Sequence, residues 1–292
     1  MGLDQVALGH ITKILESDRP ERQKLEQTLR ALAKWRSQLI GSTLVARAGT
    51  VVQGGPFKGM TYVASTSEGG IVPKLLGVYE TALHDVFLRA PEEGYDAILN
   101  VGSAEGFYAV GCARLLPEAS ILAWDVDPVA RQKCLDLARL NGVETRIALR
   151  ERFETQHLNG ICGELSATLG RRPKGLLVMD CEGAEFDLLD PKTADFSWLD
   201  LVVEVHPGRG RAVKTLAERF ESTHSVELRQ AKTIVPDLPP WLENLGHLDQ
   251  LLAVWEWRAV PTPWLVMRPP IGFSRTGSTR SFPSPCGRSL RP

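Results

Sequence analysis

Apolar and polar positions follow two different periods along this chain, and their order predicts the succession of helices and strands. Short runs rich in apolar residues predict buried strands at 97–100, 120–124, 144–149, 175–179 and 199–205. Helical periodicity separates them, at 106–116, 128–140, 158–170 and 183–190. Strands that alternate with helices predict a parallel, doubly wound α/β sheet, with any chemistry at the carboxyl ends of its strands.

The segments on either side of these units complete the expected organisation. We expect a hairpin at 50–63, a loop and a helix up to Pro91, helices at 211–222 and 248–257, and further strands at 226–229 and 264–267. Residues 1–48 read as a helical extension with an apolar stripe that packs on the core or on a second subunit, since Leu25, Leu29, Leu32, Ala33 and Leu39 recur at helical spacing. The predicted domains are therefore the extension at 1–48, an α/β domain at 49–268 and a disordered tail at 269–292.

One strand-to-helix junction carries the first sign of a ligand. The strand that ends at Asn100 is followed by a loop with Gly102 and Gly106, which allows the backbone to approach a nucleotide closely. The next strand ends in Asp125, nineteen residues after Gly106. A carboxylate at that place can accept both hydroxyls of a ribose. Asp127 and Pro128 then suit the N-cap and first position of a helix. Together these features favour a nucleoside-binding site over an ordinary strand end.

Composition narrows the class of protein. The chain has 292 residues and a net charge of -1, so it gives no reason to expect a nucleic acid or a membrane as partner. Its five cysteines are odd in number and scattered, which argues against a disulfide framework and a zinc site. We see no signal peptide and no apolar run long enough to span a bilayer. We therefore expect a cytoplasmic location.

Several motifs resemble those of a known family. Residues 100–108 and 123–128 are similar to motifs I and II of class I S-adenosylmethionine-dependent methyltransferases, and residues 179–185 to the Asp-Val-Glu-Gly-Ala-Glu block of the FkbM-type methyltransferases. Residues 77–80, 203–207 and 263–267 also resemble segments of that group, so the likeness covers about 55–268. It implies a Rossmann-like methyltransferase fold: a mostly parallel seven-stranded sheet with helices on both faces.

The resemblance also implies a cofactor, S-adenosylmethionine, and the residues that hold it. Gly102, Ala104 and Gly106 would line its methionine moiety, and Asp125 would bind its ribose. The full set of implied cofactor contacts is Asn100, Gly102, Ser103, Ala104, Gly106, Phe107, Asp125, Val126 and Asp180. Two positions depart from the general motif, since Asn100 replaces an acid and Ala104 replaces a glycine. An amide oxygen still accepts a hydrogen bond from an ammonium group but brings no charge, so we expect weaker cofactor binding.

The expected reaction is methylation of a hydroxyl on a small molecule, such as a sugar or a polyketide. Such a reaction needs a base for the hydroxyl proton, and the candidates are Asp180, Glu182, Glu185, Glu204 and His206. Of these we select Asp180, Glu204 and His206 as catalytic residues, although His206 can also be a simple turn residue before a proline, and Glu182 and Glu185 can serve only to charge a helix N-terminus. Tyr79, Glu80 and Glu182 are the substrate-contact candidates, with a packing role as the alternative for the first two. Nothing in the spacing requires a metal.

Two other functions stay open at this point. An NAD-dependent oxidoreductase also uses a glycine loop and an acid about twenty residues on, but the loop lacks the full Gly-x-Gly-x-x-Gly. A non-catalytic nucleoside-binding protein with a degenerate methyltransferase fold is the second, and Asn100 keeps it open. A homo-oligomer formed through the N-terminal helices is possible under any of these functions.

Overall fold

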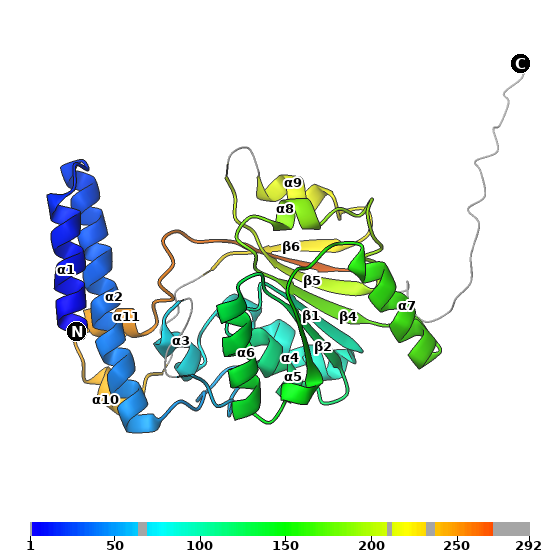
Figure 1. The fold of residues 1–292 in the computed structure, drawn as a ribbon, viewed down its shortest axis with the longest axis horizontal. Coiled ribbons are helices and arrows are strands. Elements are labelled where there is room, and N and C mark those ends of the chain that lie inside the picture. The colour runs from blue at the N-terminus through cyan, green and yellow to red at the C-terminus, as the bar shows by residue number, and fades with distance from the viewer. Residues whose placement is uncertain (1, 64–68, 209–211, 232–236, 271–292) are drawn as a thin grey trace, which may run out of the picture.

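A central sheet of seven strands organises the protein (Figure 1). The computed structural model describes residues 2–63, 69–208, 212–231 and 237–270. The strands are β1 (Ala97–Val101), β2 (Ser120–Trp124), β3 (Ile147–Arg150), β4 (Gly175–Met179), β5 (Leu199–Glu204), β6 (Ser225–Arg229) and β7 (Trp264–Arg268). Their order in the sheet is β3-β2-β1-β4-β5-β7-β6. The first five strands are parallel, and β7 runs antiparallel to both β5 and β6. This confirms the predicted Rossmann-like methyltransferase fold with its mostly parallel seven-stranded sheet.

The strand order explains where a ligand site has to lie. The chain winds outward from β1 to β2 and β3, and then returns to place β4 on the other side of β1. Ligands of doubly wound sheets bind at this reversal, outside the carboxyl ends of the strands. The registers bring Val101 level with Trp124 and Met179, so the ends of β1, β2 and β4 are adjacent.

Helices cover both faces of the sheet, because successive strand residues point to opposite sides. Ile98, Ile121 and Leu176 contribute to one core with helices α4 (His84–Glu93), α5 (Phe107–Leu115) and α6 (Pro128–Leu140). Leu99, Leu122 and Leu177 contribute to the other core with α7 (His157–Leu169), α8 (Glu185–Leu188) and α9 (Val213–Glu218). The buried runs that predicted the strands thus serve two cores at once.

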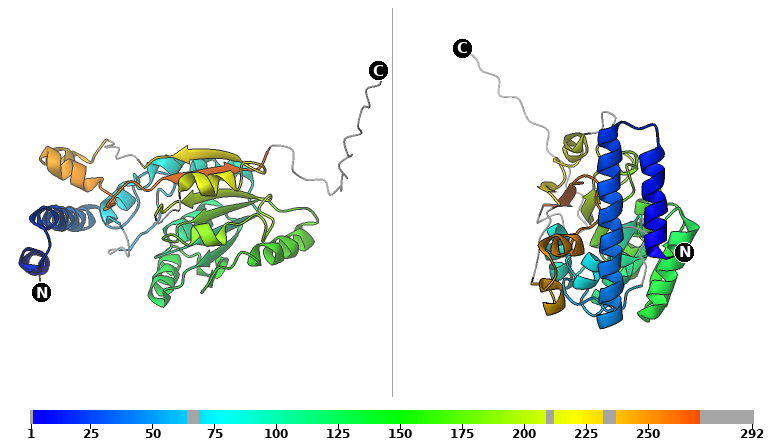
Figure 2. Two further views of the ribbon diagram at one scale, coloured as in Figure 1. Left: turned by 90° about the horizontal axis from the view of Figure 1, so that it is seen from above. Right: turned by 90° about the vertical axis from the view of Figure 1, so that its left-hand side faces the viewer.

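The helical extension lies beside the sheet domain rather than on a face of the sheet. It consists of α1 (Leu3–Glu16) and α2 (Glu21–Ala48), which form an antiparallel hairpin with α11 (His247–Ala253) and the short α10 (Pro240–Glu243) close to it (Figures 1 and 2). The carboxyl end of α2 is anchored in the domain through the buried residues Ile40, Gly41 and Leu44. Helix α3 (Ile71–Leu76) packs directly against it.

Some expected elements differ from those observed. The predicted hairpin at 50–63 is reduced to a single antiparallel bridge between Val51 and Thr61. Residues 144–146 form a 3-10 turn before β3, and another 3-10 turn, 81–83, precedes α4. The predicted helix 183–190 is a single turn, α8, and α3 was not predicted.

The helix predicted at 248–257 ends early for a visible reason. Helix α11 stops at Ala253, and Trp257 has a positive φ of 66°, so the chain turns away from the helix axis. That turn carries Glu256 and Arg258 toward the sheet edge, where both form the contacts described below. The predicted helix 211–222 is shorter in its described part, 213–218, and the predicted tail lies almost entirely outside the described residues. Among the described helices, none is both long and apolar enough to cross a bilayer.

Candidate cofactor and active site

The loop between β1 and α5 is pressed against the carboxyl end of the sheet. Gly102 has φ +75°, and a Cβ on it would lie 1.6 Å from the carbonyl oxygen of Asp180. Gly106 has φ +94°, and a Cβ there would lie 2.6 Å from the Sγ atom of Cys134. Both positions therefore require glycine. Ala104 between them also has a positive φ, 45°, which costs an alanine roughly 1 kcal/mol.

Asp125 closes this loop from the end of β2. One carboxylate oxygen accepts the N–H of Ala104 at 2.8 Å, and the other accepts the N–H of Asp127 at 2.9 Å. Each carboxylate oxygen has a further lone pair, so Asp125 can hold the loop and still accept two ribose hydroxyls. Val126 beside it is 71% exposed and presents an apolar surface of the kind that a nucleobase covers. Asp127 caps α6 by accepting from the N–H of Val129, as predicted.

Asn100 and Ser103, both buried, each have a side-chain oxygen without a hydrogen-bond partner among the described residues. Asn100 is 2% exposed; its side-chain N–H₂ approaches the carbonyl of Val178 at 3.4 Å, and its Oδ1 atom has no hydrogen-bond partner. The Oγ atom of Ser103, which is 4% exposed, is in the same situation. A buried polar group without a partner costs about 1–3 kcal/mol. A ligand with N–H donors would satisfy Asn100, so these residues fit the ammonium end of S-adenosylmethionine.

Behind the loop lies an ion pair that the sequence did not reveal. Glu105 is almost fully buried, and its Oε1 atom accepts a hydrogen bond at 2.6 Å from Lys74 on α3 and another from the hydroxyl of Tyr62. The Lys74 ammonium also lies 4.8 Å from the ring centre of Tyr79 and 5.7 Å from that of Phe107. Burial alone would raise the pKa of Glu105, but the ammonium and the hydroxyl outweigh it and hold this pKa below its usual value. Phe107 is thus part of the wall around Lys74.

A histidine and three carboxylates meet where β4 and β5 end. The Nε2 atom of His206 lies 3.7 Å from Asp180 and 3.6 Å from Glu182, and its Nδ1 atom lies 3.6 Å from Glu185. Glu185 is completely buried and accepts two backbone N–H groups, from His206 at 2.7 Å and from Gly183 at 2.8 Å. Glu185 therefore fixes the position of the histidine rather than merely charging a helix terminus.

The charge of His206 follows from these neighbours. Burial alone would lower its pKa, but Glu185 together with Asp180, Glu204 and Glu182 raises it to about 9. Burial alone would also raise the pKa of Glu185, and the interaction with His206 lowers it instead. His206 is therefore a cation at neutral pH, and its positive charge interacts with several neighbouring carboxylates.

The same groups have the chemistry of a metal site. One ligand atom from each of Asp180, Glu182 and His206 lies within 4.8 Å of the others, and carboxylates with imidazole suit several divalent ions. We expected no metal because the spacing required none. The charged form of His206 can balance one of the two negative charges of Asp180 and Glu182.

Arg258 joins the other two predicted acids in a buried network. Its guanidinium donates to Glu80, Glu204 and Glu256, and Tyr108 donates to Glu80. Glu256 also accepts the backbone N–H of Glu80 at 2.8 Å. Burial and the charge of Glu204 raise the pKa of Glu80 well above its usual value, although Arg258 opposes the shift. Glu204, a catalytic candidate, is 2% exposed and held in this network.

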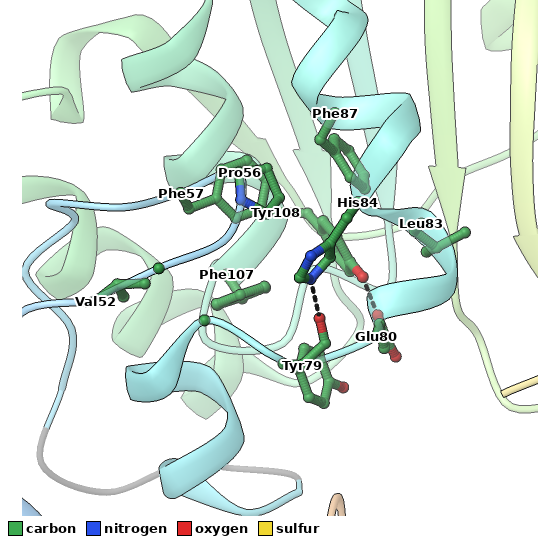
Figure 3. A pocket seen from close by; sticks show the side chains of 12 residues that line it. Val52, Pro56, Phe57, Tyr79, Glu80, Leu83, His84, Phe87, Phe107 and Tyr108 are labelled. Atoms are coloured by element: carbon green, nitrogen blue, oxygen red, sulfur yellow. Dashed lines mark hydrogen bonds between the residues drawn. The ribbon is translucent and has the colours of Figure 1, made fainter. Parts of the chain in front are cut away.

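Tyr79 and Glu80 line a narrow, aromatic cleft next to the glycine loop (Figure 3). Its walls include Phe107 and Tyr108 at the start of α5, and His84 bonds to the carbonyl of Tyr79 at 3.0 Å. Glu80 has a positive φ of 49°, an unusual conformation for a glutamate. Burial is the main cause of the raised pKa values of Tyr79 and Glu80, and the charge of Asp180 adds to both shifts.

The structure thus brings most of the predicted site residues to one edge of the sheet, with three qualifications. Glu204 and Glu80 are engaged with Arg258, and Glu182 is exposed at the rim. The residues missed by the sequence reasoning are Tyr62, Lys74, Glu105 and Arg258. Only Glu105 carried a signal, as the single charged residue inside the glycine loop.

The chain is similar to several solved structures. The chain is similar to the solved structure of cofactor-bound Rv0187 from MTB, with 15% identity, 66% of this chain and 83% of that chain covered, and a TM-score of 0.40. It is similar to the O-methyltransferase TomG from Streptomyces achromogenes in complex with SAM, with 14% identity, 62% and 77% covered, and a TM-score of 0.37. For precorrin-6y C5,15-methyltransferase from Geobacter metallireducens the values are 13%, 59%, 78% and 0.38.

These likenesses are distant. Identities and TM-scores in this range carry no conclusion about the activity of the chain, and the fold rests on its own strand order. No family model matches the sequence, and no curated protein matches it. The resemblance to the FkbM-type group therefore remains a prediction.

Proposed function

We propose that this chain is an S-adenosylmethionine-dependent methyltransferase of the FkbM type that methylates a hydroxyl group of a small molecule. The observation that carries the proposal is the buried amide oxygen of Asn100, which has no partner among the described residues. It lies at the end of β1, adjacent to the loop that Asp125 closes. An ammonium acceptor and a ribose acceptor on neighbouring strands match the two ends of this cofactor, whereas NAD has no ammonium group to offer Asn100.

The proposed cofactor contacts follow from this match. Asn100 would accept from the ammonium group, the loop from Gly102 to Gly106 would line the methionine chain, and Asp125 would accept the ribose hydroxyls. Val126, exposed beside Asp125, would cover the adenine. When bound, this cofactor would supply a methyl group on a positively charged sulfur: the acceptor oxygen would bond to the methyl carbon as the carbon–sulfur bond breaks, and the sulfur would leave as a neutral thioether.

We assign the base to His206. An attacking hydroxyl has to lose its proton, and the Nε2 atom of His206 lies at the open end of β4 and β5 with Asp180 and Glu182 around it. Glu185 holds the other side of the ring from a fully buried position, as a positioning residue. Because the pKa of His206 is raised to about 9, the fraction of His206 that is neutral and can accept a proton increases as the pH rises toward that value.

The remaining predicted residues receive supporting roles. Asp180 would orient the acceptor and the histidine, and Glu182 at the rim would contact the acceptor. Tyr79 and Glu80 would form the opposite wall, with Glu80 held by Arg258 and Tyr108. Glu204 is assigned to that network instead of to proton transfer. The four described cysteines are free, which supports the reducing, cytoplasmic location that we keep as part of the proposal.

The experiment that tests the cofactor is calorimetric titration with S-adenosylhomocysteine, run beside NAD on the same preparation. We expect micromolar binding of the first and none of the second, and at least about tenfold weaker binding after Asp125→Ala. Asp136→Ala, a change in an exposed ion pair on α6, is the matched control and should leave the affinity unchanged. Binding of NAD alone would refute the methyltransferase proposal, and binding of neither would indicate a degenerate site.

A screen of hydroxylated acceptors with a labelled methyl donor tests the base. His206→Ala should lower kcat by about a hundredfold or more and leave the affinity for S-adenosylhomocysteine unchanged. His157→Ala, at the start of α7, provides a control histidine away from the cluster. Equal loss of activity and cofactor affinity in His206→Ala would contradict the assignment.

A further inference from the structure

The hairpin of α1 and α2 is a pair of long helices with almost no core of its own. Among its described residues from Leu3 to Arg36, Ile14 is the single buried side chain. Helices gain most of their stability from packing an apolar face, and an isolated hairpin with one buried residue is marginal. Part of its apolar surface must therefore be covered by something else.

The uncovered surface is a leucine face on one side of this hairpin. Lys24 bonds to the carbonyl of Leu15 and Trp35 bonds to Asp4, so these positions of α2 face α1 and set the two helices in antiparallel register. In an α-helix each residue is rotated by about 100° from the one before it. Because the two helices run in opposite directions, the residues that follow the contact positions point to the same side of the pair on both helices. The leucines one step past the contact positions are Leu8 and Leu15 on α1 and Leu25, Leu29 and Leu32 on α2, which are 64, 50, 68, 70 and 44% exposed.

The register makes these five side chains one surface, which we call the leucine face. Because Lys24 is level with Leu15, and Trp35 with Asp4, Leu25 lies near Leu15 and Leu32 near Leu8. Leu25, Leu29 and Leu32 follow the spacing of four and three residues that forms a seam along a helix. Two adjacent rows of leucines on antiparallel helices are half of a four-helix bundle.

The part of the seam that follows Leu32 is in contact with another helix of the same chain. Arg36, four residues past Leu32, binds Asp249 of α11 through two hydrogen bonds of 2.7 and 2.5 Å. Helix α11 thus packs across the carboxyl end of the seam, as Figures 1 and 2 show. Two leucines of α11 itself, Leu248 and Leu251, are also exposed, by 68 and 51%. The seam on α2 is thus covered by α11 at Arg36 and is exposed at Leu25, Leu29 and Leu32.

We propose that the leucine face binds the leucine face of a second copy of this chain, so that the two hairpins form a four-helix bundle and the protein is a twofold dimer. A flat, two-helix surface complements itself about a twofold axis, and such isologous dimers are the commonest oligomers. This proposal is independent of the catalytic function proposed above.

The charges around the leucine face favour a protein partner over a membrane. From Glu21 to Arg36, helix α2 carries two acidic and five basic residues. Arg22 pairs with Glu26 at 3.2 Å, and the other four basic side chains contact the protein itself: Lys24 at Leu15, Arg30 at Ala259, Lys34 at Trp257 and Arg36 at Asp249. A helix that binds anionic lipid uses the Lys and Arg of its polar face to meet the lipid. The basic side chains of this part of α2 are instead engaged within the chain, which leaves the leucine face to a protein partner.

The test is the mass of the full chain in solution, measured by light scattering and by sedimentation velocity from micromolar to hundreds of micromolar concentration. The variant L25E/L29E places four acids in the proposed interface. The matched control is L88E/L140E, which changes leucines that are 58 and 56% exposed on α4 and α6. Circular dichroism and thermal unfolding of the catalytic domain verify that both variants fold.

We expect a dimer for the wild type and for the control, and at least about a hundredfold weaker dimerisation for L25E/L29E. A monomeric wild type over the whole range would overturn the proposal. So would a dimer that survives L25E/L29E, because a different surface would then form it. A monomeric wild type that cosediments with phosphatidylserine vesicles would also overturn it and assign the leucine face to a membrane.

Discussion

Replacing Lys74 with methionine asks whether the buried ion pair behind the glycine loop determines the shape of that loop. The side chains of Lys74 and Glu105 are 4 and 1% exposed, so water cannot replace either partner. Methionine keeps the unbranched apolar stem that packs near Tyr79 but removes the ammonium. Glu105 would then be a buried carboxylate inside the cofactor loop without its cation.

The expected cost can be set from the burial of the pair. Removing one partner of a buried ion pair costs about 3–5 kcal/mol, mainly because it leaves a charge in a poor environment. Neutralising that charge as well, in Lys74→Met/Glu105→Gln, should reduce the total cost to about 1–2 kcal/mol. The two changes are therefore strongly coupled, and the double variant should be more stable than Lys74→Met alone.

The assay is urea unfolding near neutral pH, repeated in acid. In the wild type the pKa of Glu105 is lowered, so its stabilising effect is present above the unfolded pKa and is lost as the pH falls through the folded value. In Lys74→Met the folded pKa of Glu105 should instead be raised, so the variant should regain stability relative to the wild type as the pH falls. Lys58→Met, at an exposed lysine, is the control.

Two results would refute this reasoning. The first is a loss of less than about 1 kcal/mol in Lys74→Met, since removing the cation from a buried carboxylate should cost about 3–5 kcal/mol. The second is a double variant whose loss equals the sum of the two single losses, which would mean that the pair is not coupled. In addition, S-adenosylhomocysteine should bind Lys74→Met more weakly than Lys58→Met, because the ion pair holds Glu105 within the loop.

Further outcomes follow from the site. Activity should rise with pH toward about 9, because His206 accepts a proton only when neutral, and a profile flat from neutral pH upward would exclude it as the base. Because the pKa of His206 is raised by folding, protonated His206 stabilises the fold. This stabilisation is complete below the unfolded pKa of 6.5 and is lost as the pH rises to about 9. In urea unfolding, the wild type should therefore lose more stability than His206→Gln over that pH range. Ala104→Gly should stabilise the fold by about 0.5–1 kcal/mol, whereas Gly102→Ala should abolish cofactor binding measured by calorimetry. Asn100→Asp should bind S-adenosylhomocysteine about tenfold more tightly yet unfold at a lower temperature without it, because the new buried charge gains its partner only from the ligand.

Predictions from sequence succeeded where the cause was local. The strands were recognisable because buried parallel strands are short, continuous apolar runs, and the turn after β1 because Gly102 and Gly106 adopt conformations that glycine favours. The cap at Asp127 was predictable for the same reason, since an N-cap bonds only to residues of its own first turn. The predicted end of this helix at residue 257 was wrong, because tertiary contacts of Glu256 and Arg258 override the helical periodicity of the sequence there.

The sequence by itself therefore determined the order of the elements, the nucleotide-type loop and the edge at which the chemistry gathers. Only the tertiary structure decided which charged groups meet: Lys74 with Glu105, Glu185 with His206, and Glu80 with Arg258. These partners lie 31, 21 and 178 residues apart, and no local rule links them. The physical reason is that helices and turns form through contacts between near neighbours, whereas a buried charge is stabilised by whichever opposite charge the packed fold brings within reach.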